Sequence, residues 1–195
     1  MSAPVITIEP YVASFCERVV PDQSPVFVTI TPDKGARRSE CYEAVEKRIE
    51  KHGGAKVYGW DILEWPGVFI ESEFHCIWRS PDGNLLDVTP REIPFKRILF
   101  LPDPKRVYEG FQIDNVRLIR VNDPLVYRFI ELAELLFQER NRGDLKYIHG
   151  EVAVRGAYAQ YFQEKIQIEM QLMPKYGHAM IHSIQSNTWG PPHSA

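Results

Sequence analysis

The sequence has few cysteines and lacks the spacings that would pair them or bind zinc. Its 195 residues contain three, Cys16, Cys41 and Cys76, an odd number without a C-x-x-C pair. A disulfide framework and a zinc ribbon are therefore not indicated, and free thiols are expected. One of these thiols is a candidate for a reactive group.

Long apolar runs, internal repeats and a strong charge of one sign are also missing. No run of 18 apolar residues occurs, and the first ten residues lack the basic region and apolar stretch of a secretory signal. The formal net charge of −3 gives no support to a nucleic-acid-binding or anionic-membrane surface. We expect a cytoplasmic protein without nucleic-acid or membrane partners, and the sequence leaves its oligomeric state open.

The composition that remains is that of a globular protein, with 44% hydrophobic and 25% charged residues. The length suits one domain with a substantial core. We expect a single α+β domain over residues 1–183, with a core at 24–121 and a helical elaboration at 123–176. A mobile tail is expected at 184–195, where periodicity is weak and two prolines occur near the end.

Hydrophobic periodicity and turn residues predict the secondary structure. Helices are expected at residues 9–20, 40–52, 124–140 and 153–173. Strands are expected at residues 24–31, 55–65, 68–78, 85–89, 98–101 and 116–121. The middle of the chain should then form an antiparallel sheet, and Ser39 is a candidate N-cap for the second helix.

A tight turn joins two strand-like runs around His75. The segment Ser80-Pro81-Asp82-Gly83-Asn84 is typical of a type I turn followed by a left-handed residue. A three-residue loop gives cross-strand partners whose numbers sum to 164, so Asp87 faces Ile77. Asp87 is then a diagonal neighbour of His75, at roughly 7 Å between backbones. The hairpin predicts an imidazole–carboxylate pair, although a surface histidine near an acidic turn has the same pattern.

Cys41 is expected in the first turn of the second helix. The free N–H groups and partial positive charge of a helix N-terminus stabilise a thiolate, and Lys34, Arg37 and Arg38 add positive charge nearby. Glu40 and Glu43 add negative charge near Cys41, which disfavours a thiolate. A buried core cysteine is the alternative, and the downstream histidine and aspartate favour the nucleophile.

Cys41, His75 and Asp87, in this order, resemble the catalytic arrangement of the transglutaminase-like branch of the papain-like cysteine enzyme superfamily. The matching residues are Cys41 at a helix start, His75-Cys76-Ile77-Trp78, Asp82-Gly83 and Asp87-Val88-Thr89-Pro90. They are similar to the H-x-W strand, turn and D-P-T strand end of that superfamily. This chain has D-V-T-P instead, and Trp78 lies three places after His75 rather than two. The match covers about residues 35–90.

The resemblance implies a papain-like or transglutaminase-like core, in which a helix packs on an antiparallel sheet, and a cysteine-dependent reaction on an amide. Cys41 would be the nucleophile, His75 the base and Asp87 the group that orients the imidazole. The backbone N–H of Cys41 would contribute to an oxyanion hole, for which no side-chain donor precedes it at short range. Peptidase, deamidase and transglutaminase chemistry all remain open, on a peptide or protein substrate and without a cofactor.

Several alternatives remain open at this stage. Glu73 shares the face of His75 and is a second candidate for the orienting carboxylate. Trp60, Trp65 and Trp78 are candidates for a substrate groove or, more simply, for the core. Cys16 and Cys76 are expected in the core. A non-catalytic binding domain is the competing function, and His178 and His182, at helical i, i+4 spacing, are candidate metal ligands.

Overall fold

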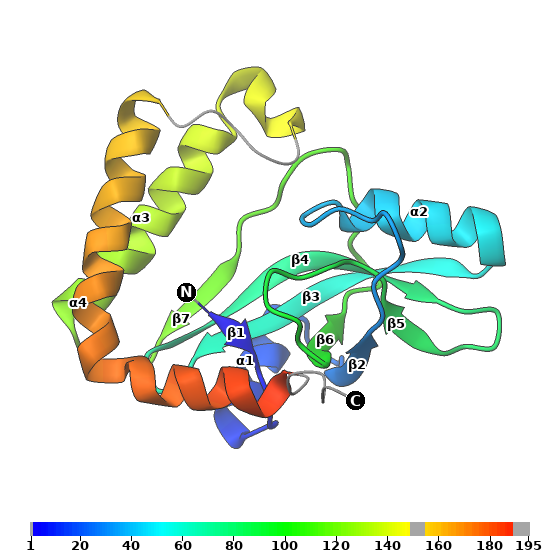
Figure 1. Ribbon diagram of the computed structural model, residues 1–195, viewed down its shortest axis with the longest axis horizontal. Helices are drawn as coiled ribbons and strands as arrows, with labels where there is room; N and C mark the ends of the chain where they lie inside the picture. Colours follow the sequence, from blue (N-terminus) through cyan, green and yellow to red (C-terminus); the bar gives the residue numbers. More distant parts are fainter. Residues whose placement is uncertain (1, 149–154, 189–195) are drawn as a thin grey trace, which may run out of the picture.

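Helices and a curled sheet make up the described chain, residues 2–148 and 155–188 of a computed structural model (Figure 1). The helices are α1 (Pro10–Val19), α2 (Cys41–His52), α3 (Pro124–Arg140) and α4 (Gly156–Asn187), with a 3₁₀ turn at Gly143–Tyr147. The strands are β1 (Ala3–Pro4), β2 (Val26–Ile30), β3 (Ala55–Trp65), β4 (Phe69–Arg79), β5 (Leu85–Asp87), β6 (Arg97–Pro102) and β7 (Val116–Ile119). The expected α+β content is confirmed.

The sheet closes on itself into a small barrel. Its strand order is β1-β3-β6-β2-β5-β4-β7, and β3 also pairs with β4, which closes a ring of β3, β6, β2, β5 and β4. β1 and β7 extend this ring at the edges of β3 and β4. The β2–β5 pairing is parallel, and the other pairings are antiparallel within the described residues. The expectation of a wholly antiparallel sheet is therefore wrong at this one pair.

β3 and β4 form the long ribbon on which the rest is built. They pair from Ala55↔Arg79 to Trp65↔Phe69, and the turn between them contains Gly67 with φ of 77°. Alternation of side chains gives the ribbon two apolar faces. One face of β4 packs with α1 and α2 through Phe74 and Cys76, and the other contributes Ile77 to the largest core cluster. Both faces are therefore covered.

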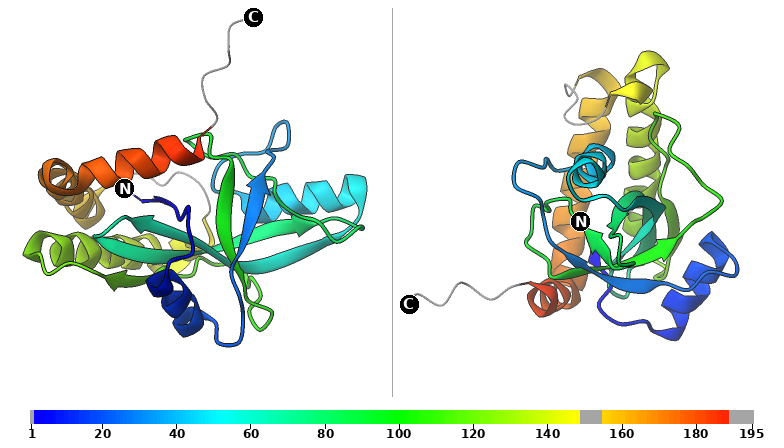
Figure 2. Two further views of the ribbon diagram at one scale, coloured as in Figure 1. Left: turned by 90° about the horizontal axis from the view of Figure 1, so that it is seen from below. Right: turned by 90° about the vertical axis from the view of Figure 1, so that its right-hand side faces the viewer.

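The helices lie at different parts of this ribbon. α3 and α4 pack side by side at one end of it, and α2 lies towards the other end (Figures 1 and 2). Asp123 caps α3 by accepting a hydrogen bond from the Leu125 N–H at 2.9 Å. Its carboxylate also accepts hydrogen bonds from Lys175 Nζ (3.2 Å) and from the Tyr176 hydroxyl (3.0 Å). One carboxylate thus fixes the start of α3 against α4.

α4 is longer than the sequence pattern predicts. It continues past residue 173 and through Pro174 to Asn187, and Figure 1 shows that it bends sharply midway. A proline inside a helix removes one backbone hydrogen bond and crowds the preceding turn, which accounts for a bend here. The boundary expected at residue 184 is wrong, because the chain is helical there and Asn187 is buried. The rest of the expected tail, 189–195, lies outside the described residues.

α2 begins at Cys41, as the pattern predicts, but its cap differs. Glu40 is the N-cap residue and makes no side-chain capping bond. Ser39, the predicted N-cap, instead has φ of 61°, a left-handed conformation that a side chain disfavours. The chain therefore makes a sharp turn just before Cys41 enters the helix. Within the described residues, no helix has both the length and the apolarity needed to cross a membrane.

Candidate active site

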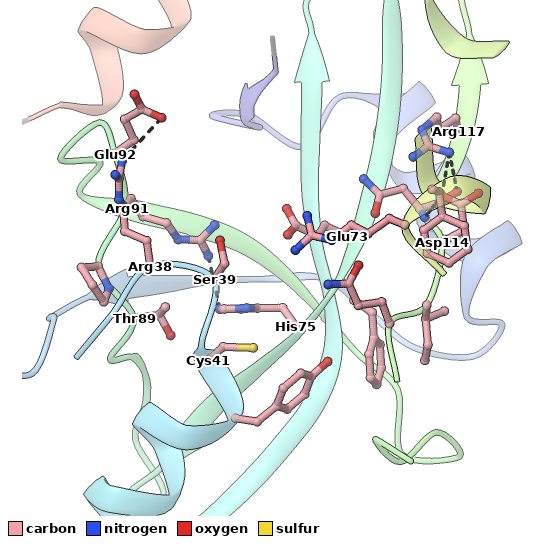
Figure 3. A pocket seen from close by; sticks show the side chains of 18 of the residues that line it. Arg38, Ser39, Cys41, Glu73, His75, Thr89, Arg91, Glu92, Asp114 and Arg117 are labelled. Atoms are coloured by element: carbon pink, nitrogen blue, oxygen red, sulfur yellow. Dashed lines mark hydrogen bonds and ion pairs between the residues drawn. The ribbon is translucent and has the colours of Figure 1, made fainter. Parts of the chain in front are cut away.

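Cys41, His75 and Asp87 meet at one point on the barrel. His75 Nε2 lies 3.1 Å from Asp87 Oδ2. The Cys41 thiol lies beside the imidazole, close enough to interact with it by hydrogen bonding (Figure 3). Because Nε2 faces Asp87, Nδ1 is the ring nitrogen left for the thiol. All three side chains are at least nine-tenths buried.

The hairpin register positions the imidazole and the carboxylate. Trp78 pairs with Leu86 and Arg79 with Leu85, which is the register predicted from the turn. Asp87 ends β5 and is held from its other side, since the Thr31 N–H donates to the Asp87 carbonyl at 2.8 Å. The Thr89 N–H donates to Asp87 Oδ1 at 2.9 Å. These hydrogen bonds hold the carboxylate in place independently of its contact with His75.

A gap between strands lets the tip of α2 reach the imidazole. β4 pairs with β7 through residues 69–72 and with β5 through residues 78–79. Residues 73–77 lie between these two pairings, so this part of the β4 edge faces the tip of α2. α2 packs beside it through Cys41, Ala44 and Val45, which share a core cluster with Cys76. Cys41 is the first helical residue, so its backbone N–H has no acceptor within the helix.

Arg91 and Asp61 complete the polar cluster, and sequence reasoning did not find them. Arg91 Nη2 donates to Asp87 Oδ2 at 2.7 Å and lies 3.2 Å from His75 Nε2. Arg91 Nη1 lies 2.8 Å from Asp61 Oδ2. Asp61 is fully buried in the apolar run of β3, and such an acid requires a partner of opposite charge. That requirement was the signal available in the sequence.

The charges in the cluster favour a protonated imidazole. Burial alone would lower the pKa of His75, but the Asp87 carboxylate and the Cys41 contact raise it to about 10. Burial alone would raise the pKa of Asp87. The positive charges of His75 and Arg91 outweigh burial and hold the pKa of this carboxyl well below its ordinary value. Burial raises the pKa of Asp61, with Arg91 opposing it. A charged imidazole stabilises a neighbouring thiolate.

A cleft of about 790 Å³ opens at this cluster. One wall carries Cys41, His75, Thr89 and Arg91, and Figure 3 shows these side chains gathered on the same side. The opposite wall comes from segments more than 20 residues further along the chain. It contains Gln112, Asn115, Phe137, Tyr158 and Phe162. This volume lies within the range of pockets that bind drug-sized ligands, about 300–1,000 Å³.

The remaining candidate residues fall elsewhere or in other roles. Asp87, rather than Glu73, contacts the imidazole, and Glu73 lies on the same cleft nearby. Trp60, Trp65 and Trp78 are buried in the core. Cys16 and Cys76 are buried too, and burial raises the pKa of both thiols, that of Cys16 to about 12.

The two candidate metal ligands lie on the outer surface of α4. His178 and His182 are exposed. Among residues 2–148 and 155–188, no group of three or more His, Cys, Asp or Glu side chains is arranged to hold a metal ion. A histidine pair alone supplies only half of a tetrahedral zinc site.

Comparisons with protein-family models, with curated proteins and with solved structures gave no match.

Proposed function

We propose that the protein is a cysteine-dependent amide hydrolase or acyltransferase, with Cys41 as nucleophile, His75 as base and Asp87 as orienting acid. The convergence of these three residues on an open cleft carries the proposal. We also propose that the barrel with α2 at its side is a divergent papain-like or transglutaminase-like core. The helix-tip cysteine and the strand-borne histidine support that relationship.

The arrangement supports a two-step acyl transfer. The Cys41 thiolate attacks the carbonyl carbon of an amide, so that a C–S bond forms and the C–N bond breaks. The His75 imidazolium gives its proton to the leaving amine. Water or an acceptor amine then loses a proton to His75 and attacks the thioester carbon. The C–S bond breaks, and Cys41 returns as a thiolate beside the imidazolium.

The oxyanion that forms in each step needs hydrogen-bond donors. The free N–H of Cys41 at the start of α2 is one donor, and the helix dipole adds partial positive charge there. No glutamine or asparagine precedes Cys41 at short range, but Gln112 brings a side-chain amide to the cleft from the opposite wall. We therefore propose Gln112 as the side-chain donor to the oxyanion.

Alkylation by iodoacetamide tests the nucleophile. At pH 7 we expect Cys41 to react at least about 100-fold faster than Cys16, because only Cys41 has an imidazolium beside it and an opening to the cleft. His75→Ala should slow the reaction of Cys41 by at least about tenfold and leave Cys16 unchanged. Peptide mapping by mass spectrometry gives both rates. Equal rates at Cys41 and Cys16 would falsify the enzyme proposal.

A non-catalytic binding domain is the second candidate function. Arg91 favours it, because this guanidinium shares Asp87 with His75 and takes part of the charge that would stabilise the imidazolium. In that case Cys41 would react slowly and His75→Ala would not change its rate. The alkylation experiment therefore decides between the two functions.

A further inference from the structure

Glu73 is a carboxylate of the cleft that lacks a cationic partner. It precedes His75 by two residues on β4, so both side chains lie on the same face of the strand (Figure 3). Two other carboxylates line the cleft, and both are paired: Glu92 with Arg38 at 3.6 Å and Asp114 with Arg117 at 3.0 Å. Among the described residues, Glu73 has no ion pair and its side chain is exposed to the cleft.

The surrounding charges leave Glu73 uncompensated. Arg91 and His75 are the cations that act on Glu73, and the two terminal nitrogens of Arg91 already contact Asp61 and Asp87. Asp61, Asp87 and Glu73 thus share Arg91 and His75, and Arg140 is a further cation in the lining of the cleft. Solvent reaches Glu73 through the cleft, but protein atoms surround it closely enough that desolvation raises the pKa of its carboxyl, with Arg91 opposing the shift. A ligand cation at this place would remove that penalty.

We propose that Glu73 binds a positively charged amino group of the substrate beside the Cys41 thiol. The proposal rests on Cys41 being the nucleophile of the function proposed above, and it names the chemical class of substrate. Glu73 and His75 are about 7 Å apart along β4. Because the Cys41 thiol contacts the His75 ring, an amine on Glu73 lies near an acyl group on Cys41. The aromatic side chains of Phe137 and Phe162 on the opposite wall suit the apolar part of an alkylamine such as a lysine side chain.

Charged thiol reagents of similar size test this without a known substrate. Three methanethiosulfonates are used, with 2-aminoethyl, 2-hydroxyethyl and 2-sulfonatoethyl groups. The thiolate of Cys41 bonds to the transferred sulfur of each reagent, and methanesulfinate leaves. Rates at Cys41 are measured by mass spectrometry at pH 8 and divided by the rates of each reagent with free 2-mercaptoethanol, which removes intrinsic differences.

We expect the aminoethyl reagent to be favoured over the hydroxyethyl reagent in the wild type, and the sulfonate to be disfavoured. Glu73→Gln should reduce the aminoethyl preference about tenfold, the effect of one unit charge at this range in a partly desolvated site. Glu73→Asp should keep part of the preference for the aminoethyl reagent. Glu92→Gln is the matched control, because Glu92 lines the same cleft but is paired with Arg38, and it should change the preference less than about twofold.

Two failures are distinguishable. If none of the reagents modifies Cys41 in the folded protein, the proposed nucleophile is wrong. If Cys41 reacts rapidly in wild type and in Glu73→Gln with the same reagent preference, the nucleophile stands and the amine site is wrong. A thermal unfolding curve for each variant excludes misfolding, and Glu73→Asp retains the test if Glu73→Gln does not fold.

The amine belongs either to the acyl donor or to the acceptor. Acylation by the p-nitrophenyl esters of lysine and norleucine, followed as nitrophenolate release, reports on the donor. A preference for lysine that Glu73→Gln removes assigns the amine to the donor. Deacylation of acetyl-Cys41 by 1,5-diaminopentane reports on the acceptor, and a rate that falls in Glu73→Gln assigns it there. If neither rate depends on Glu73, the proposal is overturned.

Discussion

At the scale of single residues, the site is a balance of buried charges. Asp87 accepts a hydrogen bond from Arg91 and contacts the His75 ring, so its negative charge stabilises both cations. Arg91 in turn connects Asp87 to Asp61, which is fully buried. Breaking one member of such a network leaves another charge without a partner in a place that water does not reach, which makes every member costly to remove.

His75→Gln should change how stability depends on pH. The pKa of His75 is about 10 in the folded protein and about 6.5 in the unfolded chain. The stabilisation by the charged ring is therefore complete below about pH 6.5 and is lost as pH rises towards 10. We expect wild type to exceed His75→Gln by about 3 kcal/mol more at pH 6 than at pH 10, from urea unfolding. A gap that stays constant over this range would show that the ring is neutral throughout.

Residue-level reasoning from sequence reached part of this cluster. The turn after Arg79 fixes the register, and this was enough to bring Asp87 near His75. Arg91 lies beyond the strand end in an irregular segment, where no periodicity predicts direction. Its partner Asp61 is on another strand, 30 residues earlier. Contacts of this kind depend on how β3, β4 and the 88–91 segment meet, which local patterns do not determine.

At the scale of elements, the close approach of β3 and β6 depends on Gly59. A Cβ added there would lie 2.3 Å from the Leu101 carbonyl oxygen and 2.6 Å from the Phe100 ring. Backbone atoms of a paired strand cannot move away independently. The barrel therefore closes at this point only because the residue has no side chain.

Gly59→Ala should destabilise the protein by about 3 kcal/mol, since the added methyl group forces β3 and β6 apart. Gly67→Ala is the comparison: its Cβ meets nothing within 4 Å, but φ is +77°, so only conformational strain of about 1 kcal/mol is expected. Denaturant unfolding of both variants measures the difference. If both variants lose the same free energy of unfolding, the Leu101 backbone accommodates the added methyl group and this prediction is wrong.

Elements differ in how well the sequence predicted them. β3 was predicted with its observed ends, because Gly54 and Pro66 mark both of its limits. The parallel β2–β5 pair was not predicted, since these two strands are neighbours only through the closure of the barrel, which local patterns do not determine. The predicted helix ended before Pro174, but α4 continues through it, because packing against α3 and the barrel outweighs the local cost of a proline.

At the scale of the whole molecule, the end of α4 returns to the barrel. The Lys96 N–H donates to the Asn187 carbonyl at 2.7 Å, and Asn187 Nδ2 donates to the Arg97 carbonyl at 2.8 Å. Phe95 forms an isolated bridge with Thr188. The last helix is thus joined to the start of β6, 90 residues earlier.

Asn187→Ala should cost about 1 kcal/mol, because it leaves the Arg97 carbonyl without this part-buried hydrogen bond. Amide exchange at Lys96 and Arg97 should become faster in the variant, and urea unfolding should give the loss in stability. Ser186→Ala, next to it, is the control: its hydroxyl donates to the His182 carbonyl on an exposed face, and little change is expected. If the two variants behave alike, the Asn187 junction does not hold α4 to the barrel.

The two walls of the cleft come from separate segments of the chain. The thiol, the imidazole and the acid all come from residues 41–87, whereas the facing wall comes from residues 112–117 and from α3 and α4. Exchange of side chains on that facing wall can therefore alter which molecules fit the cleft without changing Cys41, His75 or Asp87. An engineer seeking a new selectivity would begin at Tyr158 and Phe162, and natural divergence has the same route open to it.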